Sequence, residues 1–311
     1  MTQLPLWQES VIDESEIDSL GHMNVRFYLA RVDSAFQQIL EGSGLIPGAH
    51  EKLRRFETYS RFFQEQFEGN RLETRGGLIK ANGTIGVTGY FEIRNQETGQ
   101  LSACFIVRTG IIDKETQKPR TSPLEGDLLK LKIEIPDYAT PRSLSLKEPK
   151  QVLLEDLEDL ISDEPIPGMM SGRRENIILP EDCDSQGQLR EDLELMFIMH
   201  RPIPGQSQDT FGPPQLNDRA GRRYSWAMME TRQFVFAKPR LDDAVLSLSA
   251  DVAFGEKWRQ SRRWMFVKDT GLLLGVHDSV GVCMDLDERR SIAIPEDVRV
   301  GLERNYLPNL A

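Results

Sequence analysis

The segment EIDSLGHMNVRFYLARVDSAFQQIL, Glu16 to Leu40, sets the interpretation of the whole chain. Its residues Asp18-Ser19-Leu20-Gly21-His22-Met23-Asn24 place an acid, a glycine, a histidine and an asparagine within one short turn. Apolar residues then recur at helical spacing, and the pattern ends at Gly42-Ser43-Gly44. The segment therefore predicts a polar turn that leads directly into a long amphipathic helix.

Length and composition narrow the class of protein. A chain of 311 residues, 39% hydrophobic and 28% charged, predicts about two ordinary globular domains. No apolar run approaches the roughly 18 residues of a membrane helix, and the first ten residues do not resemble a signal peptide. Three distant cysteines (Cys104, Cys183, Cys283) suit a reducing compartment, so we expect a cytoplasmic protein.

Charge and missing motifs exclude several functions. The net charge of −11 argues against nucleic acid or anionic membranes as partners. The sequence has no Walker-type phosphate loop, no GxGxxG and no GxSxG. Its four histidines lie far apart, without a second ligand at metal-binding spacing, so we expect no metal and no cofactor.

The chain repeats itself. Asp18-Ser19-Leu20-Gly21 recurs as Asp184-Ser185-Gln186-Gly187, an offset of 166. Phe67 with Arg71-Leu72-Glu73 recurs as Phe236 with Arg240-Leu241-Asp242, an offset of 169, and Glu97-Thr98-Gly99 with Asp113 recurs as Asp269-Thr270-Gly271 with Asp285, an offset of 172. Three matches in order, with slowly growing offsets, predict two copies of one fold.

Each copy has the pattern of a short strand, the Asp-x-x-Gly turn, a helix and several strands joined by hairpin turns. Ile85, Val87, Gly89, Phe91 and Ile93 fall on one face of a strand, and Glu97-Thr98-Gly99 turns into the next strand. This order predicts an α+β fold in which each antiparallel sheet wraps a long central helix. We expect domains at 1–147 and 169–311, joined by an acidic linker at 148–168 with a short helix.

A strand, then Asp-x-x-Gly-His-Met-Asn, then a helix with Tyr28 and Asp33 resembles the hotdog-fold thioesterases of the 4-hydroxybenzoyl-CoA type. The resemblance is strongest over residues 8–45 and returns faintly over 174–290. Two copies in one chain are similar in layout to acyl-ACP thioesterases and would form an internal pseudo-dimer. In the plant members of that group the His/Asn motif is in the second copy, whereas here it is in the first, so the resemblance covers the fold and not that enzyme's site.

Hydrolysis of a thioester needs an activated water or a carboxylate nucleophile, and donors for the carbonyl oxygen. The resemblance implies that Asp18 is the base or nucleophile, with Gly21 shaping the turn and His22 and Asn24 orienting water or substrate. Backbone N–H groups near Asn24 and Val25, at the positive end of the helix dipole, would polarise the carbonyl. Asp33 and Tyr28 are weaker substrate-binding candidates, and Tyr28 also suits the core.

A structural alternative stays open at the turn, because Asp is a favoured helix N-cap and Gly21 could serve the turn alone. In the second copy Gln188-Leu189 replace His22-Met23, and Arg190-Glu191 replace Asn24-Val25. Asp184 is therefore only a candidate for a second site. The basic groups Arg54-Arg55, Arg222-Arg223 and Arg259 with Arg262-Arg263 suit coenzyme A phosphates or, more often, a solvated surface.

The sequence thus predicts hydrolysis of an acyl-CoA or acyl-carrier-protein thioester. A hydratase or dehydratase of the same fold and a non-catalytic acyl-CoA-binding protein are the alternatives. Association of two such chains into a homodimer stays open.

Overall fold

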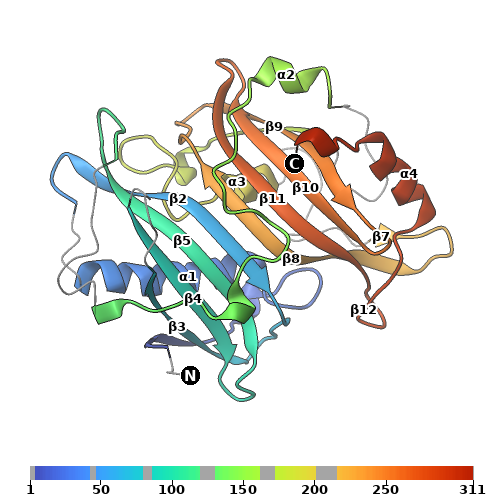
Figure 1. Cartoon of the computed structure of the whole chain (residues 1–311), viewed down its shortest axis with the longest axis horizontal. Coiled ribbons are helices and arrows are strands. Elements are labelled where there is room, and N and C mark those ends of the chain that lie inside the picture. The colour runs from blue at the N-terminus through green and yellow to red at the C-terminus, as the bar shows by residue number, and fades with distance from the viewer. Residues whose placement is uncertain are drawn as a thin grey trace. The chain divides into compact units, whose positions relative to one another are not determined.

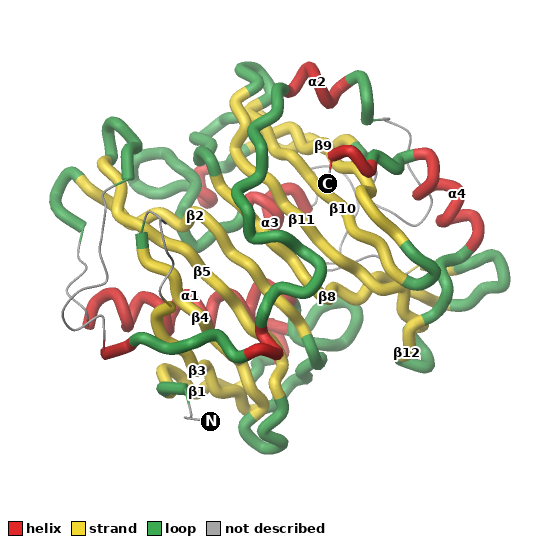
Figure 2. Tube along the Cα trace, viewed as in Figure 1, coloured by secondary structure: helices red, strands yellow, loops and turns green. Residues whose placement is uncertain are grey.

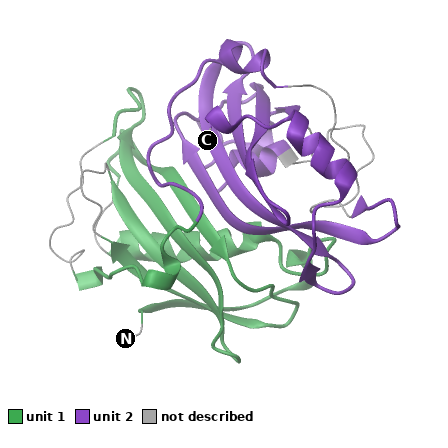
Figure 3. Cartoon of the chain, turned by 45° about the vertical axis from the view of Figure 1, so that its right-hand side comes forward, with its two compact units in different colours: residues 1–142 green, residues 143–311 purple. Residues whose placement is uncertain are grey.

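The computed structural model describes residues 4–42, 47–79, 86–119, 130–161, 172–200 and 216–310. The chain divides into two compact units, Met1–Arg142 and Ser143–Ala311 (Figure 3). Antiparallel strands dominate both units and helices are few (Figure 2), so the α+β class is confirmed. No helix among the described residues is long and apolar enough to cross a membrane.

Unit 1 contains one antiparallel sheet in the order β1-β3-β4-β5-β2. Its strands are β1 (Leu6–Val11), β2 (Glu51–Phe62), β3 (Arg71–Ile79), β4 (Val87–Asn95) and β5 (Leu101–Asp113). Helix α1 (Val25–Gly42) lies across one face of this sheet (Figure 1). The predicted turn directly precedes Val25, the first residue of α1, so the turn lies at the helix N-terminus.

The core of unit 1 is the apolar stripe of α1 packed on alternate residues of the sheet. Val32, Phe36 and Ile39 recur at helical spacing and are fully or almost fully buried. The ring centroids of Phe36 and Phe91 are 5.4 Å apart. Val87, Phe91 and Ile93 join this core, which confirms the predicted face of β4, while Ile85 lies outside the described residues.

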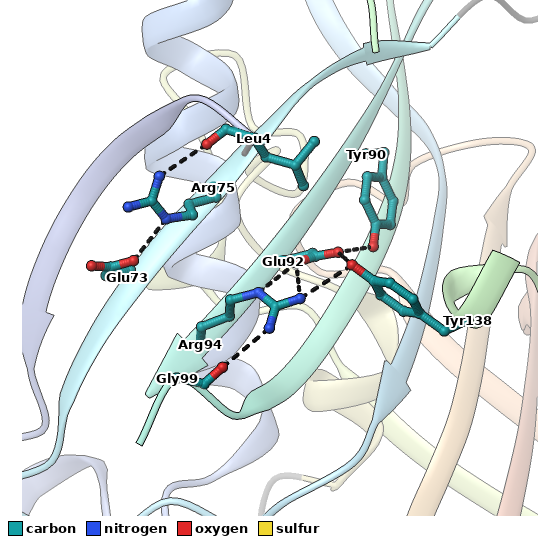
Figure 4. A network of polar contacts seen from close by, with 8 residues as sticks. All are labelled: Leu4, Glu73, Arg75, Tyr90, Glu92, Arg94, Gly99 and Tyr138. Atoms are coloured by element: carbon teal, nitrogen blue, oxygen red, sulfur yellow. Dashed lines mark hydrogen bonds and ion pairs between the residues drawn. The ribbon is translucent and has the colours of Figure 1, made fainter. Parts of the chain in front are cut away.

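The other face of the unit 1 sheet carries a polar network (Figure 4). The buried carboxylate of Glu92 accepts hydrogen bonds from the hydroxyls of Tyr90 and Tyr138 and from Arg94 Nε at 2.7 Å. Arg94 also donates to the carbonyl oxygen of Gly99 at 3.1 Å. The network fastens the segment around Tyr138 to β4, because a buried carboxylate is stable only when its oxygens have donors.

Unit 2 has the same topology, with the strand order β6-β9-β10-β11-β8. These strands are β6 (Arg173–Ile177), β8 (Arg223–Val235), β9 (Ala244–Phe254), β10 (Trp258–Val267) and β11 (Leu272–Asp285). Two short strands, β7 (Leu216–Asn217) and β12 (Arg290–Ser291), pair with β8 and β11. Its helices are α2 (Leu154–Glu158), α3 (Leu195–His200) and α4 (Glu296–Arg304).

The two faces of the unit 2 sheet bury different elements. On one face, Leu157 of α2 and Ile161, which follows the helix, pack with Leu246 and Trp264. These two residues belong to the segment expected to be a linker, and its described part, to Ile161, contributes a short helix to this core. The domain boundaries themselves stay a prediction. On the other face α3 packs against the sheet, as α1 does in unit 1.

The sequence match of Glu97-Thr98-Gly99 and Asp113 with Asp269-Thr270-Gly271 and Asp285 is equivalent in structure. Gly99 and Gly271 each close a hairpin turn with positive φ, +69° and +66°. Their N–H groups donate to the carbonyl oxygens of Asn95 and Val267 at 2.8 and 2.9 Å. Asp113 and Asp285 accept N–H groups from the turns that follow β5 and β11.

The match of Phe67 with Phe236 is wrong in register. The N–H of Phe67 donates to the side chain of Asn70, and the equivalent bond in unit 2 runs from Arg240 to Asp243. Phe67 therefore corresponds to Arg240. In unit 1 the Arg-Leu-acid triplet begins four residues after Phe67, whereas in unit 2 it begins at Arg240 itself. The two triplets are therefore not equivalent, because the insertion before β9 is longer than the offset of 169 implies.

Candidate active site

The turn at Asp18 is held by backbone hydrogen bonds and by the aspartate itself. Gly21 N–H donates to Asp18 O at 2.9 Å, Asp18 N–H to His22 O at 3.0 Å, and Leu20 N–H to Asp18 Oδ1 at 2.8 Å. Gly21 has a φ of +80°, a conformation that favours glycine because it has no Cβ. The turn therefore needs both the acid and the glycine, and it leaves Asp18 Oδ2 for other partners.

Asn24, and not Asp18, caps helix α1. Its Oδ1 accepts the N–H of Arg26 at 3.1 Å, the bond expected of an N-cap. Its Nδ2 lies 3.4 Å from Asp18 Oδ2, so the same side chain joins the aspartate to the first turn of the helix. The alternative in which Asp18 serves only as the helix cap is therefore wrong.

The first turn of α1 has one open backbone donor close to this aspartate. The resemblance implies that the N–H groups of both Asn24 and Val25 face a substrate carbonyl. The Asn24 N–H instead donates to Glu16 O at 2.9 Å, which corrects that expectation. The Val25 N–H has no acceptor among the described residues. It lies at the positive end of an 18-residue helix, where an oxygen that gains negative charge is stabilised.

His22 lies between two carboxylates. Its Nδ1 is 3.8 Å from Asp18 Oδ1, and its Nε2 is 3.5 Å from Glu65 Oε1. The Asp18 side chain is only 3% exposed, whereas that of Glu65 is 31% exposed. Glu65 was not predicted, since it follows β2 in a segment without a motif and reaches His22 only through the tertiary fold. Within the described ranges, no three His, Cys, Asp or Glu side chains gather as metal ligands do.

The remaining two candidates on α1 are engaged within the protein. Tyr28 is buried in the core, with its ring against Phe62 and its hydroxyl 3.4 Å from Gln64 O. Burial, followed by the charges of Glu65 and Asp18, raises the pKa of Tyr28. Asp33 forms an ion pair with Arg55 of β2 and lies about 12 Å further along the helix axis than Val25. A substrate contact for either residue stays a prediction.

A buried ion pair fixes the turn to the rest of unit 1. Arg31 of α1 donates to both carboxylate oxygens of Glu16, at 3.0 and 2.7 Å, and to Ser10 Oγ of β1 at 2.8 Å. Glu16 in turn holds the Asn24 N–H through its carbonyl oxygen. No pattern in the sequence indicates this pair, because Arg31 lies fifteen residues from Glu16.

Unit 2 repeats the three hydrogen bonds of the turn and adds a fourth, from Gln188 N–H to Asp184 Oδ1 at 3.0 Å. Gly187 N–H donates to Asp184 O at 3.0 Å, Asp184 N–H to Gln188 O at 2.8 Å, and Gln186 N–H to Asp184 Oδ1 at 2.8 Å. The predicted replacement of His22 by Gln188 and of Asn24 by Arg190 is confirmed, since Arg190 N–H donates to Asp182 O as Asn24 N–H does to Glu16 O.

The helix that follows begins at a different place in the two units. Helix α3 starts at Leu195, eleven residues after Asp184, whereas α1 starts seven residues after Asp18. Glu191, expected at the position of Val25, therefore precedes the helix. Lys238 follows β8 where Glu65 follows β2, and it pairs with Glu191 at 3.1 Å. Unit 2 thus keeps the aspartate turn without the helix N-terminus beside it.

No protein-family model and no curated protein sequence matches the chain. Its structure is similar to the 12:0-ACP thioesterase from Umbellularia californica, with a TM-score of 0.64 at 10% identity, over 89% of this chain and 93% of that one. It is also similar to an acyl-ACP thioesterase from Bacteroides thetaiotaomicron, with a TM-score of 0.59 at 10% identity, over 88% and 96% of the two chains. The chain therefore has the fold of these acyl-ACP thioesterases, as the motif at Asp18 suggested.

Proposed function

We propose that the chain hydrolyses an acyl thioester to a free acid and a thiol at the Asp18 turn of unit 1. One observation carries the proposal. A buried carboxylate, Asp18, is joined through Asn24 to the first turn of α1, where the Val25 N–H is an open donor. A carboxylate and an oxyanion donor on one rigid turn are what addition to a thioester carbonyl requires.

In the first step Asp18 Oδ2 takes a proton from water, and the water oxygen adds to the thioester carbon. The carbonyl oxygen gains the negative charge and accepts a hydrogen bond from the Val25 N–H. Asn24 holds the Asp18 carboxylate next to the N-terminus of α1, because its side chain bonds to both. Because Asp18 is almost fully buried, its interaction with the reacting groups is screened little by solvent.

In the second step the carbon–sulfur bond breaks and the thiolate leaves. The proton held by Asp18 passes to the sulfur, with His22 as the neighbouring group able to relay it, and Glu65 fixes the imidazole from its other nitrogen. A second route has the same overall balance. Asp18 attacks the carbonyl carbon, expels the thiolate and forms a mixed anhydride, which water then hydrolyses.

The carrier of the acyl group is part of this proposal. The protein from Umbellularia californica is a 12:0-ACP thioesterase, and coenzyme A presents the same thioester, so both carriers belong in the assay. We propose one working site per chain, in unit 1, because the helix of unit 2 starts four residues further from its aspartate.

The test is thiol release from short, long and aromatic acyl groups on coenzyme A and on acyl carrier protein. Asp18→Asn keeps an oxygen for the Leu20 N–H and removes the base. We expect turnover to fall at least about a hundredfold, the scale of losing a general base. Asp184→Asn makes the same change in the equivalent turn of unit 2 and should leave turnover within about twofold of wild type.

Two results would contradict the proposal. If Asp18→Asn and Asp184→Asn lower turnover equally, the site is not in unit 1. If no substrate releases thiol while acyl-CoA still raises the melting temperature, the chain binds acyl thioesters without hydrolysing them. Where turnover is found, a single turnover in ¹⁸O-water can identify the anhydride route, since label enters the Asp18 carboxylate when water attacks the aspartyl carbon of the anhydride.

A further inference from the structure

The side of the unit 2 sheet that faces α3 carries an unusual set of charges. Met265 and Val245 on this side pack with Leu195 and Met199 of α3. Successive residues of a strand point to opposite faces, so Arg263 shares the face of Met265. Here, where a helix covers a sheet, an apolar surface is expected.

Arg263 lies at the centre of a polar row across four strands. Its cross-strand neighbours are His277 on β11 and Ser249 on β9, and Gln233 on β8 is the next neighbour of His277. Arg174 on β6 and Arg259 on β10 are close enough for their charges to act on Arg263. Arg263, His277 and Gln233 are 8%, 5% and 4% exposed.

The central groups of this row lack partners among the described residues. No hydrogen bond or ion pair reaches the Arg263 guanidinium from those residues, and its Nη1 is buried. The amide oxygen of Gln233 is also buried without a partner there. The carboxylate of Asp251 faces Arg259, at 3.6 Å, and Arg259 also lies over the ring of Trp226. Arg263 is therefore a buried positive charge that these residues do not neutralise.

The fold itself does not require these residues. In unit 1 the same row of the sheet pairs Phe91 with Phe105, and both belong to the hydrophobic core beneath α1. Arg263 and His277 occupy the equivalent positions in the row of unit 2. An arginine and a histidine thus stand where the sister unit has two phenylalanines. Burial of a cation there is unfavourable unless a counter-ion offsets it.

The pKa values of Arg263 and His277 are both lowered, as expected for a buried row with excess positive charge. Burial, and then the charges of Arg174 and Arg259, lower the pKa of Arg263 to about 10. Burial and the charge of Arg263 lower the pKa of His277 to about 3, so this histidine is neutral at physiological pH. A bound anion would relieve both effects, because it offsets the positive potential that disfavours protonation.

We propose that Arg263, with Arg174, Arg259, His277 and Gln233 around it, binds a small molecule through an oxyanion, either a carboxylate or a phosphate group. The guanidinium fork matches two oxygens of such a group. A neutral imidazole offers one N–H, and the Gln233 amide offers its NH₂ when flipped. The site lies in unit 2 alone, and it does not depend on the proposed hydrolysis at Asp18.

The experiment measures the melting temperature of the full chain during titration with sodium acetate or inorganic phosphate, against sodium chloride at equal ionic strength. We expect one or both anions to raise the wild-type melting temperature by roughly 5 °C at saturation. Acetate alone would assign a carboxylate, and phosphate alone a phosphate. Arg263→Met should abolish the shift and, without anion, leave the melting temperature unchanged or higher, because it removes a buried charge.

Arg262→Met is the matched control on the same strand. Arg262 points to the opposite face and pairs with both oxygens of Asp278, at 2.7 and 3.2 Å. This variant should melt lower than wild type and keep the anion response. His277→Phe, which restores the residue type of unit 1, should weaken the response and serves if Arg263→Met does not fold. The proposal is overturned if neither anion acts beyond chloride, or if the Arg263 and His277 variants respond as wild type does.

Discussion

Replacing Arg31 by methionine tests whether a buried ion pair holds the Asp18 turn in place. Arg31 is 6% exposed and donates five hydrogen bonds, to Ser10 Oγ, to both oxygens of Glu16 and to the carbonyl oxygens of Val11 and Phe27. Methionine keeps most of the aliphatic stem but leaves the Glu16 carboxylate without its cation. Removing one partner of a buried pair costs about 3–5 kcal/mol. The Glu16 side chain is still 16% exposed, so we expect about 3 kcal/mol, the lower end.

Two measurements check this value. Urea unfolding gives the free energy directly, and about 3 kcal/mol corresponds to a fall in melting temperature of roughly 6–12 °C. Thiol release should fall roughly tenfold to a hundredfold through kcat, because Glu16 also holds the Asn24 N–H and a displaced turn misplaces Asp18. Arg75→Met is the control. Its pair with Glu73, at 2.7 Å, lies on β3 away from the turn, and Arg75 also donates to Leu4 O at 2.9 Å, so this variant should lower stability and leave turnover unchanged.

The reasoning is refuted by either of two results for Arg31→Met. A melting temperature within about 2 °C of wild type would mean that the pair contributes little net stability. A large loss of stability with unchanged kcat would mean that the turn keeps its geometry without the pair.

Three further changes test separate parts of the structure. Val25→Pro removes the open N–H at the first helical position, where proline is favoured, so thiol release should fall roughly 10²–10³-fold while melting stays close to that of Val25→Ala; equal activity would exclude this N–H as the oxyanion donor. Gly21→Ala should cost about 1 kcal/mol in urea unfolding because φ is +80°, whereas Gly42→Ala, with equally open space, should not; equal stabilities would contradict this. His277 is neutral when folded, with its pKa lowered to about 3, and takes up a proton below about pH 6.5 when unfolded. As the pH falls from about 6.5 to 3, the free energy of unfolding should therefore fall by about 1.4 kcal/mol per pH unit. His277→Phe should flatten the dependence of the urea midpoint on pH between pH 7 and 4. Parallel profiles for the variant and wild type would contradict the assignment of a neutral His277.

The sequence predicts the elements of this fold well where the signal is local. The apolar spacing after Asn24 predicts α1, and Glu97-Thr98-Gly99 predicts the turn between β4 and β5. The offset of 166 at the Asp18 turn is correct, because the three hydrogen bonds of that turn recur in unit 2. The register after β2 is wrong because the Arg-Leu-acid triplets match by composition, whereas hydrogen bonds to Asn70 and Asp243 set the equivalence.

The candidate site is predictable only in part. Asp18, Gly21, His22 and Asn24 are adjacent in sequence, and the structure brings them together at the start of α1. Glu65 lies 43 positions from His22, so only the tertiary fold reveals it. The capping role of Asn24 and the commitment of its N–H to Glu16 depend on backbone geometry, which residue types do not report.

The duplicated turn changes how such an aspartate is to be used as a marker of function. Asp184 accepts the N–H equivalent to that of Leu20 and also the N–H of Gln188, so the turn alone explains its presence in unit 2. What differs is the number of residues between the acid and the first residue of the helix, seven in one unit and eleven in the other. In other duplicated chains of this fold, we expect that spacing to separate a hydrolytic half from a purely architectural half, even where both halves retain the acid.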